Sequence, residues 1–325
     1  MRLPDFLSDV ASQRRLSAQG PGDVAVDLDV PPGQAPADHD DGYDQSTWRL
    51  VLRVFVQSKL AVIGLVIIVL MVLFSFVGPL VYHTNQIRVN LTQVTRAPSA
   101  SHLLGTDDLG YDVLGRLMVG GQSSLEVGLA AAVLASVVGT IYGAISGFVG
   151  GWIDGLMMRV LDSLLALPSL LLVLVVASIV TPTIPVLIGV ITLVAWLVPA
   201  RLVRGETLAI RTRPYIEAGQ AAGAHALRLI ARHVVPNVIG IVIVQTTLAV
   251  ADAMLLLASL GFLGLGPPPP ATNWGAMLSN GLNYIYDGYW WLIYPAGLCI
   301  VLTVISFNFL GDALRDAFEV RLRQR

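Results

Sequence analysis

The stretch RTRPYIEAGQAAGAHALRLIARHVVPN, Arg211 to Asn237, is a polar, arginine-rich segment between two long apolar runs. Pro214 predicts the end of one helical segment there, because proline lacks a backbone N–H group. The small residues from Ala218 to Ala226 predict a slim helical stretch, and Gly223 permits a tight break within it. A thin surface of this kind can enter a groove in another protein. The alternative is a short loop that carries the positive charge common to multispanning proteins.

Composition places the chain among integral membrane proteins. It is 55% hydrophobic and 13% charged, whereas soluble domains are about 25% charged. The formal net charge of −2 combines an acidic N-terminal segment with a basic remainder. Cys299 is the only cysteine, so the chain has no intramolecular disulfide framework, and the sequence predicts a buried small hydrophobe at this position.

The N-terminal segment predicts two different structures. Residues 1–47 are rich in Pro, Gly, Ala and Asp without apolar periodicity, which predicts a disordered acidic tail. The segment also lacks the apolar core of a signal peptide. Residues 48–59, WRLVLRVFVQSK, mix bulky apolar side chains with Arg and Lys and predict an interfacial helix. A simple extension of the first span is the alternative.

The remainder, residues 60–325, predicts an all-α, multispanning membrane domain. A helix needs about 20 apolar residues to cross the hydrocarbon core, which predicts six transmembrane helices at 60–81, 124–148, 156–180, 185–203, 237–257 and 290–311. Arginines gather between the fourth and fifth spans and after the sixth. The positive-inside rule therefore places both termini in the cytoplasm. The cytoplasmic loop is then 204–236, and the external loops are 82–122 and 258–289.

Several residues within the spans have predicted roles. Gly139, Gly143 and Gly147 recur on one face, which favours close helix packing within the subunit or against a second one. Asp252 is a costly carboxylate within a span, and it predicts either a wall of the translocation path or a structural hydrogen bond near the outer end. Kinks are expected at Pro168 and Pro199.

The arginine-rich stretch resembles the EAA loop of ABC importer permeases. The residues that carry the resemblance and would form the contact with an ATPase are Glu217, Ala218, Gly219, Gly223, Ala224, His233 and Pro236. Gly219 departs from the family pattern, which has Ala in the third place of the triplet.

Other stretches extend the resemblance from about residue 48 to the end. In order and spacing they are similar to the C-type permease subunit of dipeptide, oligopeptide and nickel importers. The stretches are HLLGTDDLGYDVLGRL (102–117), GGWIDGLMMRVLD (150–162), ASLGFLGLG (258–266), NWGAML (273–278) and FNFLGDALRDAF (307–318).

The resemblance implies a type I ABC importer fold in the cytoplasmic (inner) cell membrane. It implies a homologous permease as partner, two ATPase subunits and an extracytoplasmic substrate-binding protein, with di- or oligopeptides as substrate. The chain itself would bind no cofactor and no nucleic acid, and ATP and Mg²⁺ would be used by the partner subunits.

The residues themselves argue against an enzyme. The single lysine, Lys59, follows no Gly-rich loop, so the chain has no phosphate-cradling ATPase motif. No metal-binding motif appears, and His83, His102 and His225 are expected to be loop histidines. A nickel or metal-chelate importer remains an alternative within the family. Two other classes are a secondary transporter, which predicts coupling-ion ligands at broken helices, and an intramembrane enzyme, which needs a polar partner for Asp252.

Overall fold

The computed structural model describes residues 55–84 and 86–323, which belong to one compact unit, Ser46–Arg325. The predicted tail, 1–47, and most of the predicted interfacial helix lie outside the described residues.

The described part is helical, and its only β-pairing is an isolated bridge between Thr106 and Asp112. Its elements are α3 (Lys59–Val72), η1 (Leu73–Val77), α4 (Gly78–Val81), η2 (Leu91–Gln93), α5 (Val113–Val149), α6 (Gly151–Leu165), α7 (Ser169–Ser178), α8 (Ile184–Ala195), α9 (Leu197–Arg211), α10 (Pro214–Ala221), α11 (Ala226–Leu229), η3 (Ile230–Val234), α12 (Val235–Phe262), α13 (Trp274–Leu282), η4 (Ile285–Asp287), η5 (Trp290–Leu292) and α14 (Tyr294–Arg323).

Four helical stretches are long and apolar enough to cross a membrane, and two bent helix pairs bring the number to six if each pair is one span. The four stretches are Lys59–Val81, Val113–Val149, Ala226–Phe262 and Trp290–Phe318. This set agrees with an all-α multispanning fold. The predicted first span begins at Lys59, where the Ser58 side chain caps the helix.

The predicted third and fourth spans are not single straight helices. Helices α6 and α7 meet at 82°, and α8 and α9 meet at 44°. Pro168 is the N-terminal cap residue of α7 and has extended backbone angles, so α6 cannot continue through it. Pro199 lies in the first turn of α9, where its ring opposes a helical bond to the carbonyl of Ala195, the last residue of α8. Both expected kinks are present, and the one at Pro168 is a full break.

The three predicted loops contain helical segments, so the helix ends differ from the predicted ends of the spans. Helix α5 begins at Val113 rather than at 124, because the Asp112 side chain accepts a hydrogen bond from the N–H of Gly115 and caps the helix. The segment 204–236 contains the end of α9, α10, α11 and η3. The segment 258–289 contains the end of α12 and all of α13.

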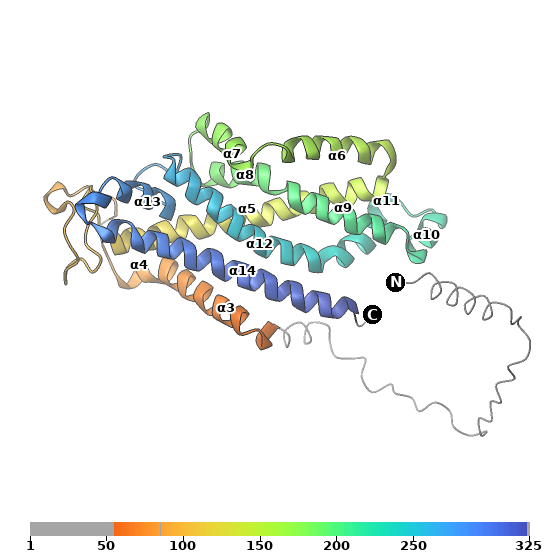
Figure 1. Cartoon of the computed structure of the whole chain (residues 1–325). Helices are drawn as coiled ribbons and strands as arrows, with labels where there is room; N and C mark the ends of the chain where they lie inside the picture. The colour runs from red at the N-terminus through yellow and green to blue at the C-terminus, as the bar shows by residue number, and fades with distance from the viewer. Residues whose placement is uncertain (1–54, 85, 324–325) are drawn as a thin grey trace, which may run out of the picture. The chain divides into compact units, whose positions relative to one another are not determined.

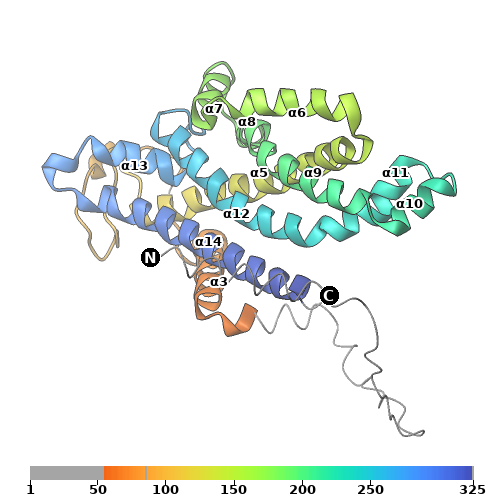
Figure 2. The same ribbon diagram turned by 45° about the vertical axis from the view of Figure 1, so that its right-hand side comes forward.

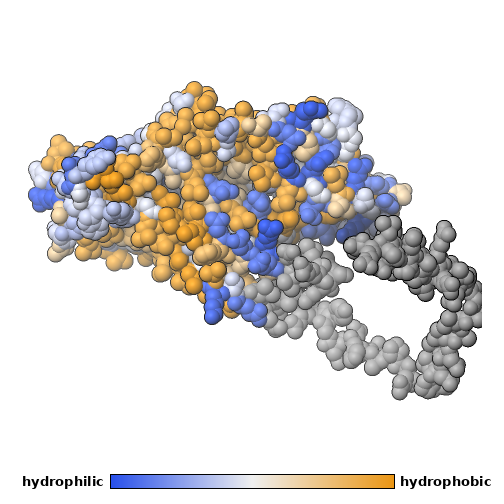
Figure 3. Space-filling model, in the orientation of Figure 1, coloured by the Kyte–Doolittle hydropathy of each residue, from blue (hydrophilic) through white to orange (hydrophobic). Residues whose placement is uncertain are grey.

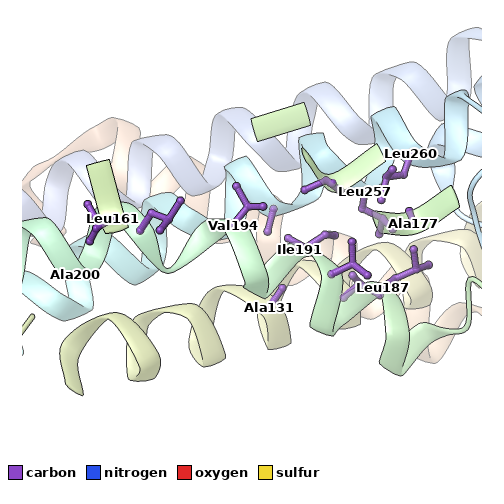
Figure 4. Packing of buried hydrophobic residues seen from close by; sticks show 14 residues of the cluster. Ala131, Leu161, Ala177, Leu187, Ile191, Val194, Ala200, Leu257 and Leu260 are labelled. Atoms are coloured by element: carbon purple, nitrogen blue, oxygen red, sulfur yellow. The ribbon is translucent and has the colours of Figure 1, made fainter. Parts of the chain in front are cut away.

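The helices pack around α5 and α12. Helices α3 and α14 lie on one side of this pair and α6, α7 and α8 on the other (Figures 1 and 2). The largest cluster of buried side chains joins α5, α8 and α12, and it includes Ala131, Ile191 and Leu257 (Figure 4). The long helices thus share one apolar core, which orients their ends.

The two ends of this helical unit differ. The loop end, defined as residues 82–112 and 263–293, contains the irregular segments and α13. The hairpin end contains α10 and α11 (Figure 1). Apolar residues form a broad band across the visible face, with hydrophilic residues at the loop end and over the half nearer the hairpin (Figure 3). Such a band is the surface that a bilayer covers.

Candidate functional site

The arginine-rich stretch folds as a helical hairpin, here residues 214–234, that follows α9 (Figures 1 and 2). Pro214 takes the first position of α10, where its missing N–H costs nothing. Glu217 lies in the first turn of α10, where its charge is favourable to the helix dipole. The second arm begins at Ala226 and runs through η3 into α12.

The turn of the hairpin is built on Gly223. Its φ of +79° is left-handed, a conformation that favours glycine. The N–H of Ala224 donates to the carbonyl of Gly219 at 3.0 Å, and the N–H of Gly223 donates to that of Gln220 at 2.9 Å. These two bonds form a Schellman motif, which ends α10. The predicted slim helix from 218 to 226 is therefore not continuous: it ends at Ala221, and the predicted break at Gly223 separates two helices.

Apolar side chains anchor the hairpin to the bundle. Ile216 is fully buried and Leu229 is 3% exposed. Both belong to a cluster that includes Ala144 and Phe148 of α5 and Val203 of α9. The inward face of the hairpin is thus fixed by burial, and the outward face is left to solvent.

The outward face carries most of the predicted contact residues. Glu217, Ala218 and Gly223 are exposed, and Gly219 and Ala224 are half-buried. Nothing lies within 4 Å of a Cβ built on Gly223, so the turn faces open space. The face is slim, because alanine and glycine make up most of it.

His233 and Pro236 lie in the second arm and are not part of this exposed turn. The His233 ring is 5.9 Å from that of Tyr215 on α10, so it joins the two arms. The carbonyl of His233 accepts a hydrogen bond from Asn237 Nδ2 at 2.6 Å. Pro236 is exposed in the first turn of α12. The structure thus groups Glu217 to Ala224 in one surface and gives His233 a position between the arms.

An ion-pair clamp beneath the hairpin was not predicted from the sequence. Asp154 of α6 accepts two hydrogen bonds, both 2.6 Å long, from Nε and Nη2 of Arg204 on α9. Ser146 of α5 donates to the same carboxylate at 2.5 Å. Arg201 and Asp162 form a second, exposed ion pair between α9 and α6. The spacing of Asp154 and Asp162, eight residues apart on α6, was the available signal, because it places both on one helix face.

The glycines predicted to mediate packing lie against α9 of the same chain. A Cβ on Gly139 would lie 2.7 Å from Cβ of Pro199, and one on Gly147 would lie 2.8 Å from the carbonyl oxygen of Arg204. A Cβ on Gly143 would lie still closer to the carbonyl oxygen of Ala200, and 2.9 Å from the backbone nitrogen of Arg204. The sequence left open whether these glycines pack within the subunit or against a second one. In the structure they pack against α9 of their own subunit, the helix that leads into the hairpin.

Asp252 lies on an exposed face of α12. Its carboxylate accepts no hydrogen bond from any residue that the structure describes, and both predicted roles of Asp252 stay predictions. Nor does the described part of the chain bring together three or more His, Cys, Asp or Glu side chains that could hold a metal.

The loop end has a buried polar network around Asp112. Asp112 Oδ2 accepts a hydrogen bond from Tyr82 at 3.0 Å and lies 2.9 Å from Nδ1 of His102. Burial raises the pKa of Tyr82, and the bond to Asp112 raises it further. Nearby, burial raises the pKa of the Asp107 carboxyl, although the backbone N–H groups of Tyr111 and Leu109 donate to it and act in the opposite direction.

Aromatic and guanidinium groups complete this network. Arg116 is 6% exposed, donates to the carbonyl of Pro270 at 2.6 Å and lies 4.7 Å from the ring centre of Tyr111. The indole N–H of Trp274 donates to the carbonyl of Leu117. The loop end is therefore a built structure, in which the buried side chains of Asp112, Arg116 and Trp274 bond to the chain itself. Two buried atoms there, Gln86 Oε1 and Asn273 Nδ2, have no hydrogen-bond partner among the described residues.

A helical unit with several membrane-spanning candidates, an apolar band and an outward-facing charged hairpin defines a multi-pass membrane protein. The family described as "Binding-protein-dependent transport system inner membrane component" matches residues 139–324. A second family, "N-terminal TM domain of oligopeptide transport permease C", matches residues 46–98.

Curated relatives agree with both matches. The chain is 41% identical over 279 residues to the oligopeptide transport system permease protein OppC of Bacillus subtilis, covering 86% of this chain and 91% of the relative. It is 45% identical over 276 residues to the dipeptide transport system permease protein DppC of Escherichia coli, covering 83% and 92%. The chain belongs to the family of binding-protein-dependent transport system inner membrane components. It is a transporter subunit and not an enzyme.

Proposed function

We propose that the chain is a permease subunit of an ATP-driven importer of di- or oligopeptides. The names of its relatives support this substrate class, since they are oligopeptide and dipeptide transport permeases. It would form the path together with a homologous permease, receive substrate from an extracytoplasmic binding protein, and contact two ATPase subunits. The chain would bind no cofactor, and ATP and Mg²⁺ would be used by the ATPases.

The hairpin is the observation that carries the proposal. Its inward face is anchored by Ile216 and Leu229, and its outward face offers a slim surface with Glu217 at one end. A rigidly anchored, thin projection can enter a groove and transmit movement to the helices behind it. Movement of the hairpin would pass to α9 through the continuous chain and to α12 through η3. The clamp between Arg204 and Asp154 would carry it to α6.

The arginines support one orientation of the chain in the membrane. Arg213, Arg228 and Arg232 are exposed at the hairpin end, so the positive-inside rule favours a cytoplasmic position for this end. Both termini would then be cytoplasmic.

Ala100 is exposed at the loop end and Ala222 at the hairpin. In a Cys299→Ala background, Ala100→Cys is expected to react with an impermeant thiol reagent in intact cells, and Ala222→Cys only after permeabilisation. Reaction of both in intact cells would contradict the orientation.

Coupling is tested by crowding the hairpin turn. Gly223→Trp places a large side chain where the structure has open space, and it is expected to lower peptide import and co-purification of the ATPases by about tenfold, equivalent to 1.4 kcal/mol of binding. Glu217→Lys reverses the charge of the proposed contact and is expected to act in the same direction. Arg228→Lys keeps its charge and is the matched control.

Membrane insertion and expression of all three variants are measured first. If Gly223→Trp and Glu217→Lys insert normally, bind the ATPases and import peptide at the parental rate, the coupling role is wrong. If the parental complex imports no di- or oligopeptide, the substrate assignment is wrong.

A further inference from the structure

Helix α12 carries a polar stripe, here Gln245, Asp252 and Ser259, along a mostly apolar span. The three residues are spaced by seven, and an α-helix drifts by only about 20° over seven residues. They therefore share one face. At about 1.5 Å per residue, the stripe extends about 21 Å along the helix, roughly two thirds of the hydrocarbon thickness.

The side chains of the stripe are less buried than those of α12 that belong to the buried clusters with α5 and α8. Asp252 is exposed, and Gln245 and Ser259 are half-buried. Within the described residues, the side chains of Gln245 and Asp252 have no hydrogen-bond partner. Ser259 donates to the carbonyl of Leu255 one turn earlier, which leaves its oxygen free to accept.

The other faces of α12 are occupied by neighbouring helices. Met254 lies against Gly128 of α5. Leu248 lies against Gly311 of α14, and Leu257 belongs to the buried cluster with α8. The polar groups thus gather on a face of α12 that the described part of the subunit leaves partly uncovered, with Asp252 the most exposed of the three.

Glu126 of α5 provides a contrast within the same molecule. It is also exposed and has no partner among the described residues. However, the residues seven positions before and after it are Val119 and Val133, and Gln122 is already bonded to the carbonyl of Ser75. Glu126 is an isolated carboxylate on an apolar face, whereas Asp252 is the centre of a stripe.

We propose that the stripe on α12 lines a water-filled path, and that Asp252 attracts the α-ammonium group of the transported peptide. This inference rests on the proposed function. A carboxylate at membrane depth is costly unless it faces water or a cation. Every peptide with a free N-terminus supplies such a cation at neutral pH, since the α-amino pKa is about 8. Gln245 and Ser259 offer uncharged hydrogen-bonding groups on both sides of the carboxylate, suited to a peptide backbone of any sequence.

The test uses the assembled transporter, with its partner permease, ATPases and binding protein, in a Cys299→Ala background. Gln245→Cys and Ser259→Cys are treated with a cationic and an anionic methanethiosulfonate reagent of similar size. Both positions are expected to react, and the cationic reagent is expected to react about fivefold faster, because one carboxylate lies about 10 Å away. Adding Asp252→Asn should remove this preference. Val133→Cys, at an exposed apolar position of α5, is the matched control and is expected not to react with either reagent.

Transport gives the second readout. Asp252→Asn is expected to lower peptide import about fivefold while the ATPase activity stimulated by the binding protein stays at the parental level, and Glu126→Gln is expected to change neither. The inference is overturned if the stripe cysteines are unreactive, if they cross-link directly to the partner permease without reagent access, or if the charge preference survives Asp252→Asn. Import of peptide by the parental complex is scored separately, so failure of the inference is distinct from failure of the proposed function.

Discussion

The loop end and the hairpin end differ in how their charged side chains are bonded. At the loop end, Asp112 is 3% exposed and has contacts with the N–H of Gly115, the hydroxyl of Tyr82 and the ring of His102. At the hairpin, Glu217 and Arg228 are exposed, and neither forms an ion pair with any residue that the structure describes. The carboxylate of Asp112 is thus bonded within the chain, whereas the charges of Glu217 and Arg228 are left exposed.

The difference bears on the proposed contact with a partner. A buried polar group without a bond costs about 1–3 kcal/mol, so the hydrogen bonds around Asp112 stabilise the loop end. Exposed charges on the hairpin contribute little to folding. Under the proposed function, their arrangement on a slim, anchored surface serves recognition rather than stability.

The largest expected loss of stability concerns the base of the hairpin, where the ion pair between Arg204 and Asp154 is bonded within the chain, as Asp112 is at the loop end. Arg204→Met leaves the carboxylate of Asp154 without its bidentate partner. The expected loss is about 3–5 kcal/mol, since an uncompensated buried charge remains. Thermal unfolding in detergent measures it. Combining Arg204→Met with Asp154→Leu removes both charges and is expected to recover most of the loss; equal losses in the single and double variants would show that the pair is not the cause.

The second test removes the centre of the loop-end network. Asp112→Ala deletes the cap of α5 and the acceptor for Tyr82, with an expected loss of about 2–3 kcal/mol. Asp112→Asn keeps a capping oxygen and should lose less. Thermal unfolding of both variants measures the order. A loss for Asp112→Ala no larger than that of an exposed loop substitution such as Ala100→Ser would contradict a structural role for the network.

The sequence predicted the all-α fold, the apolar spans and the break at Gly223, because each depends on local composition or on one residue type. It missed the start of α5 at Val113, since the apolar pattern alone does not register the cap that Asp112 provides. It also missed the clamp between Asp154 and Arg204, because their partnership depends on how α6 folds back onto α9. For the candidate site, the resemblance of the sequence to the EAA loop pointed to Glu217 to Ala224, and their contact with an ATPase stays a prediction. The anchoring by Ile216 and Leu229 required the tertiary structure.

The third test separates the backbone of the hairpin turn from its surface. Gly223→Ala forces an L side chain into φ +79° but meets no atom within 4 Å. The expected cost is about 1 kcal/mol, from the backbone alone. Gly223→Asn should cost less, because asparagine tolerates this conformation. Hydrogen exchange of the amides of residue 223 and Ala224 measures the opening of the turn. Equal exchange rates in the parent, Gly223→Ala and Gly223→Asn would show that the left-handed conformation does not limit the choice of residue.

The fourth test uses pH at the loop end. Burial raises the pKa of Asp107, so the folded chain binds this proton at a higher pH than the unfolded chain. Stability is therefore expected to rise as the pH falls through the raised pKa of the folded state and to level off below the ordinary value of the unfolded state. Two backbone N–H groups oppose the effect of burial without reversing it. Asp107→Asn should remove this change of stability with pH, and thermal unfolding between neutral and acidic pH compares the two proteins.

The smallest expected change in stability is that of Glu217→Ala, and it makes the comparison sharpest. Glu217 is exposed and unpaired within the described part of the chain, and it lies in the first turn of α10, where a carboxylate interacts favourably with the helix dipole. Its removal is expected to cost no more than about 0.5 kcal/mol in thermal unfolding of the isolated subunit. Yet binding of the ATPases should weaken measurably in the same variant, because the charge is available only to a partner.

Tyr215→Phe, which keeps the ring beside His233, serves as the matched change on the same helix and should alter neither quantity. If Glu217→Ala destabilised the isolated subunit as much as Asp112→Ala does, the hairpin surface would be structural like the loop end, and the contrast between the two ends would fail.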